Sequence, residues 1–315
     1  MSPLRIGLVG LGRHGVRYAR HLLDGEVPGA VLAAVCRRDA RAGAEWAREH
    51  GVAFHPDLAS LLRAPDVDAV ALVTPVATHR DLALAVLGAG KPLLIEKPLA
   101  DTAAAADEIG AAAARVGVPC MVAHTLRREP LYVALAELLA QRPGPVSVRY
   151  SLAMEPDGEA LRSFRGSRLL ELGVHILDWL GAVRPASAWR AECTTDAPPP
   201  GEREFTIRLR SSGLDARVDF RERPLRDESI LVSVGEAVRW LGIRFAHRLI
   251  ADGKVELPLP PRRATVPVLL GEFADCVRSG GPVPIPPSEG ARAVRLAEAA
   301  VRSAREHGAA IDVSL

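Results

Sequence analysis

Two charged residues at the end of an apolar run, Glu96 and Lys97, are the first whose position could support chemistry. They follow the apolar residues 93–95 and stand directly before Pro98. In a parallel sheet, ligands lie outside the carboxyl ends of the strands, so the last residues of a buried strand face whatever is bound. Burial disfavours the charged form of a lysine, which makes proton exchange near neutral pH possible. We therefore expect Lys97 to be a catalytic acid or base, although both residues could instead cap a strand at the surface.

A second group of ionisable residues lies on a predicted helix, 169–180. At about 100° per residue, Glu171, His175 and Asp178 fall within roughly 60° of one face, while apolar residues cover much of the rest. The carboxylates could orient His175 and leave its other nitrogen for a substrate hydroxyl. One such histidine could also be a hydrogen-bonded core residue, and the three side chains could hold a divalent ion. Our expectation is a substrate-binding site without a metal.

The elements that position these residues begin with a glycine-rich turn near the N-terminus. A short apolar strand leads into Gly10, Gly12 and Gly15, and a helical stretch and a second apolar strand follow. In a dinucleotide-binding fold these glycines permit the tight turn, the approach of a pyrophosphate and close packing of helix on strand, with the phosphates on the helix N-terminus. Arg13 and His14 lie inside the motif, so we expect them at the cofactor.

The residues after the second strand bear on the choice of cofactor. The chain continues with Arg37, Arg38 and Asp39. An arginine at this place can pair with the 2′-phosphate of NADP, whereas an acidic residue bonds the ribose hydroxyls of NAD. We expect Arg37 and Arg38 to favour NADP, with NAD as the alternative if Asp39 binds the ribose.

The alternation of strands and helices continues to about residue 124. An apolar strand, 67–73, ends in Thr74 and Pro75, which we expect to touch the cofactor, with His79 near its edge. Six such strand-helix units predict a doubly wound parallel sheet in an α/β fold. We assign residues 1–122 to this dinucleotide-binding domain.

Residues 123–315 are expected to form a second, α+β domain that binds substrate and carries the oligomer contacts. Polar and apolar residues alternate in several stretches, which is typical of strands with one wet face. These stretches are 146–152, 204–210, 214–220 and 230–234. Because the open face needs a partner, we expect a homodimer or homotetramer. Arg127 could bind an anionic substrate group or be solvated.

The motifs of the first domain together resemble one known family. The glycine motif, Thr74-Pro75 with His79, and the string Gly90 to Pro98 are similar to the glucose-fructose oxidoreductase and inositol dehydrogenase family, often written Gfo/Idh/MocA. The resemblance implies a Rossmann domain followed by a domain with an open-faced, mostly antiparallel sheet. It also implies that the lysine of Glu-Lys-Pro lies beside the nicotinamide and acts as acid or base.

The helix at 169–180 resembles the same family's Asp-x-Gly-x-His-x-x-Asp segment. Gly173, His175 and Asp178 match it, while Glu171 replaces the first aspartate. The resemblance implies that the histidine and the first acid work with the lysine, which makes His175 and Glu171 catalytic candidates. The longer glutamate moves its carboxylate by about one methylene relative to the family's aspartate.

Composition narrows the classes of partner. Forty basic and thirty-eight acidic residues leave a formal net charge of +2, so no nucleic acid or acidic membrane surface is expected. No stretch approaches the ~20 apolar residues of a membrane span. The four cysteines are far apart in the sequence, which fits a reducing compartment rather than a disulfide framework. We expect a cytoplasmic protein that binds a small molecule.

These observations predict an NAD(P)-dependent oxidoreductase that moves a hydride between nicotinamide and a carbinol or carbonyl carbon of a sugar, polyol or related small molecule. Lys97 and His175 would handle the proton. Reduction of an imine or enone and redox-assisted glycoside cleavage remain alternatives, because the fold alone does not decide function. A nucleotide-binding sensor or scaffold without turnover is the alternative outside the enzymes.

Overall fold

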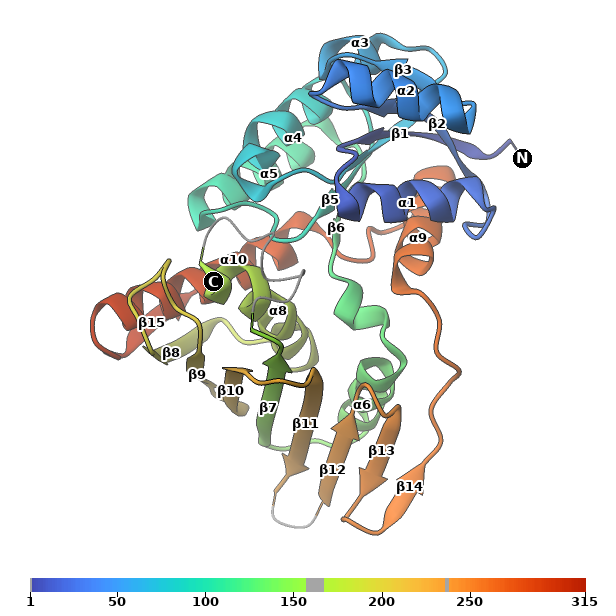
Figure 1. Ribbon diagram of the computed structural model, residues 1–315. Coiled ribbons are helices and arrows are strands. Elements are labelled where there is room, and N and C mark those ends of the chain that lie inside the picture. Colours follow the sequence, from blue (N-terminus) through green and yellow to red (C-terminus); the bar gives the residue numbers. More distant parts are fainter. Residues whose placement is uncertain (1, 157–166, 236–237) are drawn as a thin grey trace. The chain divides into compact units, whose positions relative to one another are not determined.

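The computed structural model describes residues 2–156, 167–235 and 238–315, which divide into two compact units (Figure 1). Unit 1 consists of Met1–Thr125 and Ala264–Ala291. Unit 2 consists of Leu126–Arg263 and Arg292–Leu315. Within the parts of the chain that the structure describes, no helix is both long enough and apolar enough to cross a membrane.

The segment Ala264–Ala291 differs from the predicted division of the chain, which assigned all of 123–315 to the second domain. Helix α9 (Thr265–Ser279) packs in unit 1 beside α1, as Figure 1 shows. The guanidinium of Arg278 donates to the carbonyl of Gly29 at 3.0 Å, and the carbonyl of Ile285 accepts from the N–H of Val122 at 2.9 Å. These partners are more than 150 residues away along the chain, so local sequence patterns do not reveal them.

Unit 1 is built on a six-stranded sheet in the order β3-β2-β1-β4-β5-β6, with every pair parallel. The predicted doubly wound parallel sheet is thereby confirmed. Its strands are nearly all buried, as expected for a sheet between helices. They are β1 (Leu4–Val9), β2 (Ala30–Cys36), β3 (Ala53–His55), β4 (Ala69–Leu72), β5 (Leu93–Glu96) and β6 (Cys120–Ala123).

The helices of unit 1 follow the strands in turn, and three of them begin at a side-chain cap. Asp39, Asp57 and Thr102 each accept a hydrogen bond from a backbone N–H of the first turn, which satisfies a donor without a helical partner. The helices are α1 (Arg13–Leu23), α2 (Ala40–His50), α3 (Leu58–Arg63), the short η1 (Val76–Thr78), α4 (His79–Gly88) and α5 (Ala103–Val116).

Unit 2 is built on a nine-stranded sheet in the order β14-β13-β12-β11-β7-β10-β9-β8-β15. Only β7 and β10 pair in parallel among the pairs described, which confirms the mostly antiparallel sheet. The strands are β7 (Val146–Met154), β8 (Ala188–Thr195), β9 (Phe205–Ser211), β10 (Leu214–Glu222), β11 (Asp227–Val234), β12 (Val238–Ile243), β13 (Arg248–Ala251), β14 (Val255–Leu257) and β15 (Ile311–Ser314).

Helices cover one face of the unit 2 sheet. Apolar side chains alternate along the strands and pack against these helices in one core around Trp179 and Tyr132. The helical segments are η2 (Thr125–Arg128), α6 (Pro130–Ala140), η3 (Leu169–Gly173), α8 (Val174–Val183) and the end of α10 (Pro287–Arg305).

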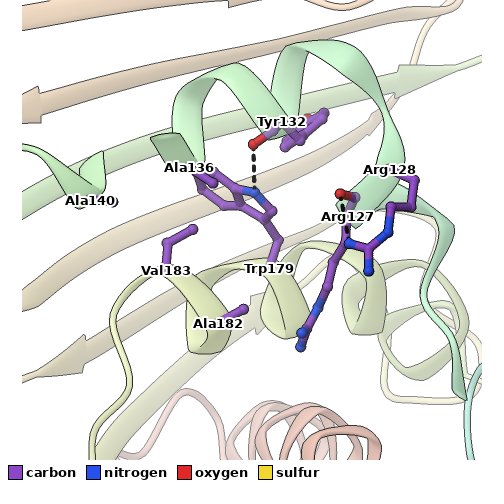
Figure 2. Close-up of a pocket in the computed structure, with 8 residues that line it drawn as sticks. All are labelled: Arg127, Arg128, Tyr132, Ala136, Ala140, Trp179, Ala182 and Val183. Atoms are coloured by element: carbon purple, nitrogen blue, oxygen red, sulfur yellow. Dashed lines mark hydrogen bonds between the residues drawn. The ribbon is translucent and has the colours of Figure 1, made fainter. Parts of the chain in front are cut away.

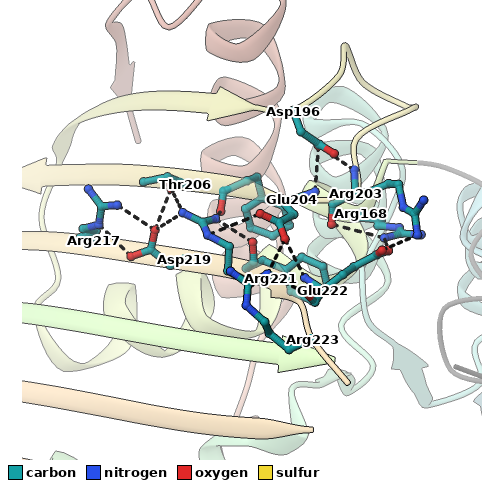
Figure 3. Close-up of polar contacts among 12 residues, drawn as sticks. Arg168, Asp196, Arg203, Glu204, Thr206, Arg217, Asp219, Arg221, Glu222 and Arg223 are labelled. Carbon is teal, nitrogen blue, oxygen red and sulfur yellow. Dashed lines mark hydrogen bonds and ion pairs between the residues drawn. The ribbon is translucent and has the colours of Figure 1, made fainter. Parts of the chain in front are cut away.

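The other face of this sheet carries charged side chains over β9 and β10 (Figure 3). Asp219 accepts hydrogen bonds from Arg217 at 2.7 Å and from Arg221 at 2.8 Å, and Thr206 donates to it at 2.7 Å. Much of the charge on this part of the face is thus paired within the chain. The face becomes apolar over β11 to β13, where Leu231 lies opposite Leu241, and Leu241 lies opposite Ile250.

Candidate functional site

The glycine turn of unit 1 joins β1 to α1. A Cβ atom on Gly10, whose φ is +103°, would lie 2.1 Å from the carbonyl oxygen of Val73, and one on Gly15 would lie 1.9 Å from that of Gly10. A Cβ on Gly12 would meet nothing within 4 Å. Gly10 and Gly15 are therefore required by packing, whereas Gly12 borders open space at the start of α1.

This start of α1 fits a pyrophosphate. Gly12 is the N-cap and supplies no side-chain acceptor, and no acidic residue lies in the first turn. The first N–H groups of a helix lack helical partners and carry a partial positive charge, so they bind anions. The local geometry is therefore compatible with the pyrophosphate site that the motif predicts. Arg13 and His14 are exposed in this turn.

Glu96 ends β5 as a buried carboxylate with three hydrogen-bonding neighbours. Its Oε1 accepts from the Tyr18 hydroxyl at 2.6 Å and lies 2.8 Å from Nε2 of His14, and its Oε2 accepts from the N–H of Lys97 at 2.9 Å. Burial acts to raise the pKa of Glu96, but His14, Lys97 and Tyr18 together lower the pKa to about 2. Glu96 is therefore an anion at neutral pH and connects the end of β5 to α1.

Tyr18 was not among the predicted site residues. It lies four residues after His14, so the two share one face of α1, and their rings meet edge to face with centroids 5.6 Å apart. Burial, together with the nearby Glu96, raises the pKa of the Tyr18 hydroxyl, which keeps it a neutral donor. The sequence signal was the four-residue spacing between His14, inside the glycine motif, and Tyr18, just after it.

His79, which we expected at the cofactor edge, is buried with only 1% of its surface exposed. Its Nδ1 lies 2.8 Å from the carbonyl oxygen of Pro98, and its Nε2 lies 2.9 Å from that of Thr74. Burial lowers the pKa of His79 despite these carbonyls. The ring thus holds together the loops that follow β4 and β5, with Thr74 half-buried and Pro75 exposed.

Lys97 stands where these contacts converge, directly after β5, and is half-buried. The chain has only three lysines among its forty basic residues. The ammonium of Lys91 donates a hydrogen bond to the carbonyl of Val67. Lys254 is exposed in the turn between β13 and β14. Arginine supplies nearly all the positive charge elsewhere, yet arginine cannot lose its proton in proteins. Lysine at position 97 can release a proton, as a catalytic acid must.

The residues after β2 lie at the edge of the same sheet. Arg37 is half-buried, and Arg38 and Asp39 are exposed. One carboxylate oxygen of Asp39 caps α2 by accepting from the N–H of Ala42 at 3.0 Å. Asp39 therefore has a structural role of its own, and the two arginines remain available beside it.

In unit 2 one residue of the predicted polar stripe, Asp178, has a charged partner on another segment. Asp178 is fully buried and forms a two-bonded ion pair with Arg127, with distances of 2.6 Å from Nε to Oδ2 and 2.5 Å from Nη2 to Oδ1. Glu171 and His175 are half-buried instead. The residues 169–173 form a π-helical turn, so the rotation of 100° per residue does not hold across them. Asp178 and Arg127, both predicted to bind substrate, thus bind each other.

The start of the π-helical turn is held by Glu202, which sequence reasoning missed. This glutamate is 1% exposed. Its Oε1 accepts from the N–H of Leu169 at 3.1 Å and from the hydroxyl of Ser167. A distant side chain therefore caps the helix that carries Glu171 and His175, and no local pattern around Glu202 indicates it.

A pocket of about 300 Å³ lies between α6 and α8 (Figure 2). The Trp179 indole N–H donates to the carbonyl of Tyr132 at 3.2 Å across its inner wall. Arg127 is the predicted substrate residue that borders it. The pocket is lined by Arg127, Arg128, Tyr132, Ala136, Ala140, Trp179, Ala182 and Val183. Among the residues that the structure describes, no group of three or more histidine, cysteine, aspartate or glutamate side chains could hold a metal ion.

Replacing Asp178 by Asn should destabilise unit 2 by about 3 kcal/mol, because it leaves the charge of Arg127 without its buried counterion. We expect a fall in melting temperature of roughly 6 to 12 °C in calorimetry. Asp312→Asn is the matched control, because its pair with Arg190 has side chains 74% and 53% exposed and, as a solvent-exposed pair, should contribute little to stability. Equal effects of the two changes would show that the Arg127–Asp178 pair contributes no more than a surface pair.

Comparison with known proteins relates both units to oxidoreductases. Residues 4–124 match the Gfo/Idh/MocA family, described as an oxidoreductase family with an NAD-binding Rossmann fold. Inositol 2-dehydrogenase 1 of Saccharopolyspora erythraea is 41% identical over 139 residues, which are 43% of this chain and 41% of that protein. The first such relatives are matched over only about two fifths of their length.

Two further matches extend over both units. D-apiose dehydrogenase of Paraburkholderia graminis is 28% identical over 318 residues, covering 89% of this chain and 83% of that protein. The solved structure of UDP-N-acetylglucosamine 3-dehydrogenase from Acidithiobacillus ferrooxidans is 20% identical, covers 98% of this chain and 99% of that chain, and has a TM-score of 0.87, so it shares the fold. Residues 4–124 thus match the Gfo/Idh/MocA oxidoreductase family, and the similarity to D-apiose dehydrogenase and the shared fold extend over both units.

Proposed function

We propose that this protein is an NAD(P)-dependent oxidoreductase that transfers a hydride between nicotinamide and a carbinol or carbonyl carbon of a sugar, polyol or related small molecule. The observation that carries the proposal is Lys97, one of three lysines, placed after a buried strand beside the dinucleotide turn. Relatives named inositol 2-dehydrogenase and D-apiose dehydrogenase support the substrate class.

In this proposal Gly10, Gly12 and Gly15 shape the turn, and the first turn of α1 binds the pyrophosphate. The loop at Thr74 and Pro75 lies at the carboxyl end of the neighbouring strand, where ligands of such sheets bind. We propose NADP as the preferred cofactor, with NAD as the alternative. Arg37 and Arg38 support NADP, since a planar guanidinium pairs well with a 2′-phosphate.

The bound cofactor supplies the hydride donor or acceptor. The proton is then handled by the protein, because an alcohol must lose its hydroxyl proton when it is oxidised and a carbonyl must gain one when it is reduced. Lys97 can exchange a proton at its amine, and Glu96 fixes its backbone N–H. His175 is the second proton-handling residue in this proposal, and we propose that Glu171 orients it.

The proposed activity is tested by mixing the protein with NAD⁺ or NADP⁺ and a panel of cyclitols, pentoses and hexoses, and with NADH or NADPH and the matching ketoses. A change of absorbance at the nicotinamide band with one class of compound is the expected result. The same panel with Lys97→Arg, which keeps the charge but cannot release a proton, serves as control. Tight cofactor binding without turnover of any compound would instead favour the sensor.

We also propose a homodimer or homotetramer through the open face of the unit 2 sheet. The row Leu231, Leu241 and Ile250 lies on this face, on three adjacent strands, and is half-buried. Sedimentation at micromolar concentration should give a dimer or tetramer. Leu241→Asp should weaken association roughly a hundredfold, because it places an unpaired charge in the interface. Leu225→Asp, in the turn before β11 and 72% exposed, should leave it intact. A monomeric wild-type protein would contradict the proposal.

A further inference from the structure

His14 occupies an unusual position for a histidine. It is the second residue of α1, its side chain is 45% exposed, and its Nε2 lies 2.8 Å from Oε1 of Glu96. A carboxylate can only accept hydrogen bonds, so Nε2 carries a proton and donates it to Glu96. Any gain or loss of a proton by His14 therefore takes place at Nδ1, the other ring nitrogen.

The groups around His14 divide into those that titrate near neutral pH and those that do not. Arginines stay charged, the pKa of Tyr18 is raised by burial, and that of His79 is lowered by burial. Glu96 stays ionised, because His14, Lys97 and Tyr18 together lower its pKa. The set comprises Arg13, His14, Arg17 and Tyr18 on α1, Glu96 and Lys97 at the end of β5, and His79 on α4.

We propose that His14 is a proton-linked ligand of the cofactor pyrophosphate, to which its protonated ring donates a hydrogen bond from Nδ1. The inference rests on the proposed cofactor site at the glycine turn. Gly12 borders open space there, and His14 follows it by two residues in the same first turn. Glu96 accepts a hydrogen bond from Nε2 of the ring, which fixes its tautomer. Neutral His14 would present a lone pair to an anion and could not donate.

The proposed protonation of His14 makes cofactor affinity fall as pH rises. Because the pyrophosphate is negative, it raises the proton affinity of His14 when it binds, so the histidine pKa is higher in the complex than in the free protein. Cofactor affinity is then highest below the pKa of the free protein and falls as pH rises through the interval between the two pKa values. Binding in the middle of that interval takes up about half a proton if the total loss is tenfold and about 0.8 of a proton if it is a hundredfold. The total loss of affinity corresponds to one charge-assisted hydrogen bond, roughly tenfold to a hundredfold.

Titration calorimetry of NADH tests this directly, because it requires no substrate. NADH is preferred to NADPH, since the 2′-phosphate of NADPH has its own pKa near about 6. Dissociation constants between about pH 5.5 and 8.5 bracket the ordinary histidine pKa of about 6.5. Repeating the titration in buffers of different ionisation enthalpy gives the protons taken up. We expect uptake near neutral pH and a dissociation constant that rises with pH.

Three variants locate the proton. His14→Gln should abolish the uptake and leave an affinity that hardly depends on pH. Glu96→Gln removes the anion behind the ring, so the loss of affinity should begin at lower pH. His21→Gln is the matched control, because His21 lies in the last turn of the same helix, where its Nδ1 is 2.5 Å from Oε2 of Glu26. It should behave as the wild type does.

The outcomes distinguish a failure of the proposed function from a failure of the role proposed for His14. If no dinucleotide binds at all, the proposed function fails. If NADH binds without uptake of a proton in the wild-type protein, only the role of His14 is overturned. Uptake that survives in His14→Gln also overturns it and assigns the proton to Lys97. Should His14→Gln not fold, the NMR titration of the His14 ring in the free and bound wild-type protein decides: an equal pKa in both states contradicts the proposal.

Discussion

Lys97→Met should lower turnover by about a hundredfold to ten-thousandfold while cofactor affinity changes little. A positioned acid or base typically contributes that factor, because without it the hydroxyl proton must be exchanged with water. In our proposal the cofactor is bound instead by the glycine turn, the start of α1 and the residues after β2. The loss should therefore appear in kcat with a similar loss in kcat/KM.

The matched variants separate the charge of Lys97 from its proton. Lys97→Arg keeps a positive charge but cannot act as a base, so it should be nearly as inactive as Lys97→Met. Lys254→Met removes an exposed lysine of the β13–β14 turn and should have full activity. Near-full turnover of Lys97→Met with a true substrate would show that the lysine at the strand end is structural.

Combining Lys97→Met with His175→Asn tests whether the two residues act together. His175→Asn alone should cost as much as Lys97→Met or less. If both serve one proton transfer, the double variant should lose much less activity than the product of the two single losses. Independent losses that multiply would mean that His175 acts on another step or on binding.

Changing Arg37 and Arg38 together to Ser should weaken NADP binding far more than NAD binding. Each charge-assisted contact with the 2′-phosphate contributes about 1.5 to 3 kcal/mol, so each lost arginine should cost roughly tenfold to a hundredfold. NAD lacks this phosphate and should bind almost as before. Dissociation constants for both cofactors, measured by titration calorimetry, give the ratio directly.

Arg48→Ser is the control for this pair, because it removes an exposed arginine from the last turn of α2 and should change neither affinity. Asp39→Asn then tests the alternative that Asp39 binds the ribose. It keeps most of the capping interaction with Ala42 but removes the charge. A loss of NAD affinity in Asp39→Asn, with no selective effect of the arginine change, would identify NAD as the cofactor.

The buried contacts of Glu96 and His79 suggest why the proposed cofactor site can be well ordered. His79 joins the loops after β4 and β5, while Glu96 joins the end of β5 to α1. Three segments of the sheet edge are thereby fixed by two buried side chains. A site held by such a second layer of contacts keeps its geometry when the ligand is absent.

Features that depend on neighbouring residues could be predicted from the sequence alone. The spacing of Gly10, Gly12 and Gly15 predicts a turn because backbone crowding within a few residues requires it, and the structure has the expected close approaches. Apolar runs and alternating patterns predicted both sheets. A strand that is buried on both faces has a continuous apolar run, and a strand that is buried on one face alternates apolar and polar residues. The position of Lys97 directly after a buried strand followed from the same local information.

Only the tertiary structure decided which ionisable side chains pair. Asp178 has a partner 51 residues away in Arg127, and Glu96 contacts residues 78 and 82 positions away in Tyr18 and His14. The π-helical turn at 169–173 is set by contacts such as that of Glu202, 33 residues from Leu169. A helical wheel counts rotation along one segment, whereas a buried charge is stabilised by whichever opposite charge or donor the fold brings to it. That partner can belong to another segment, as Arg127 does for Asp178.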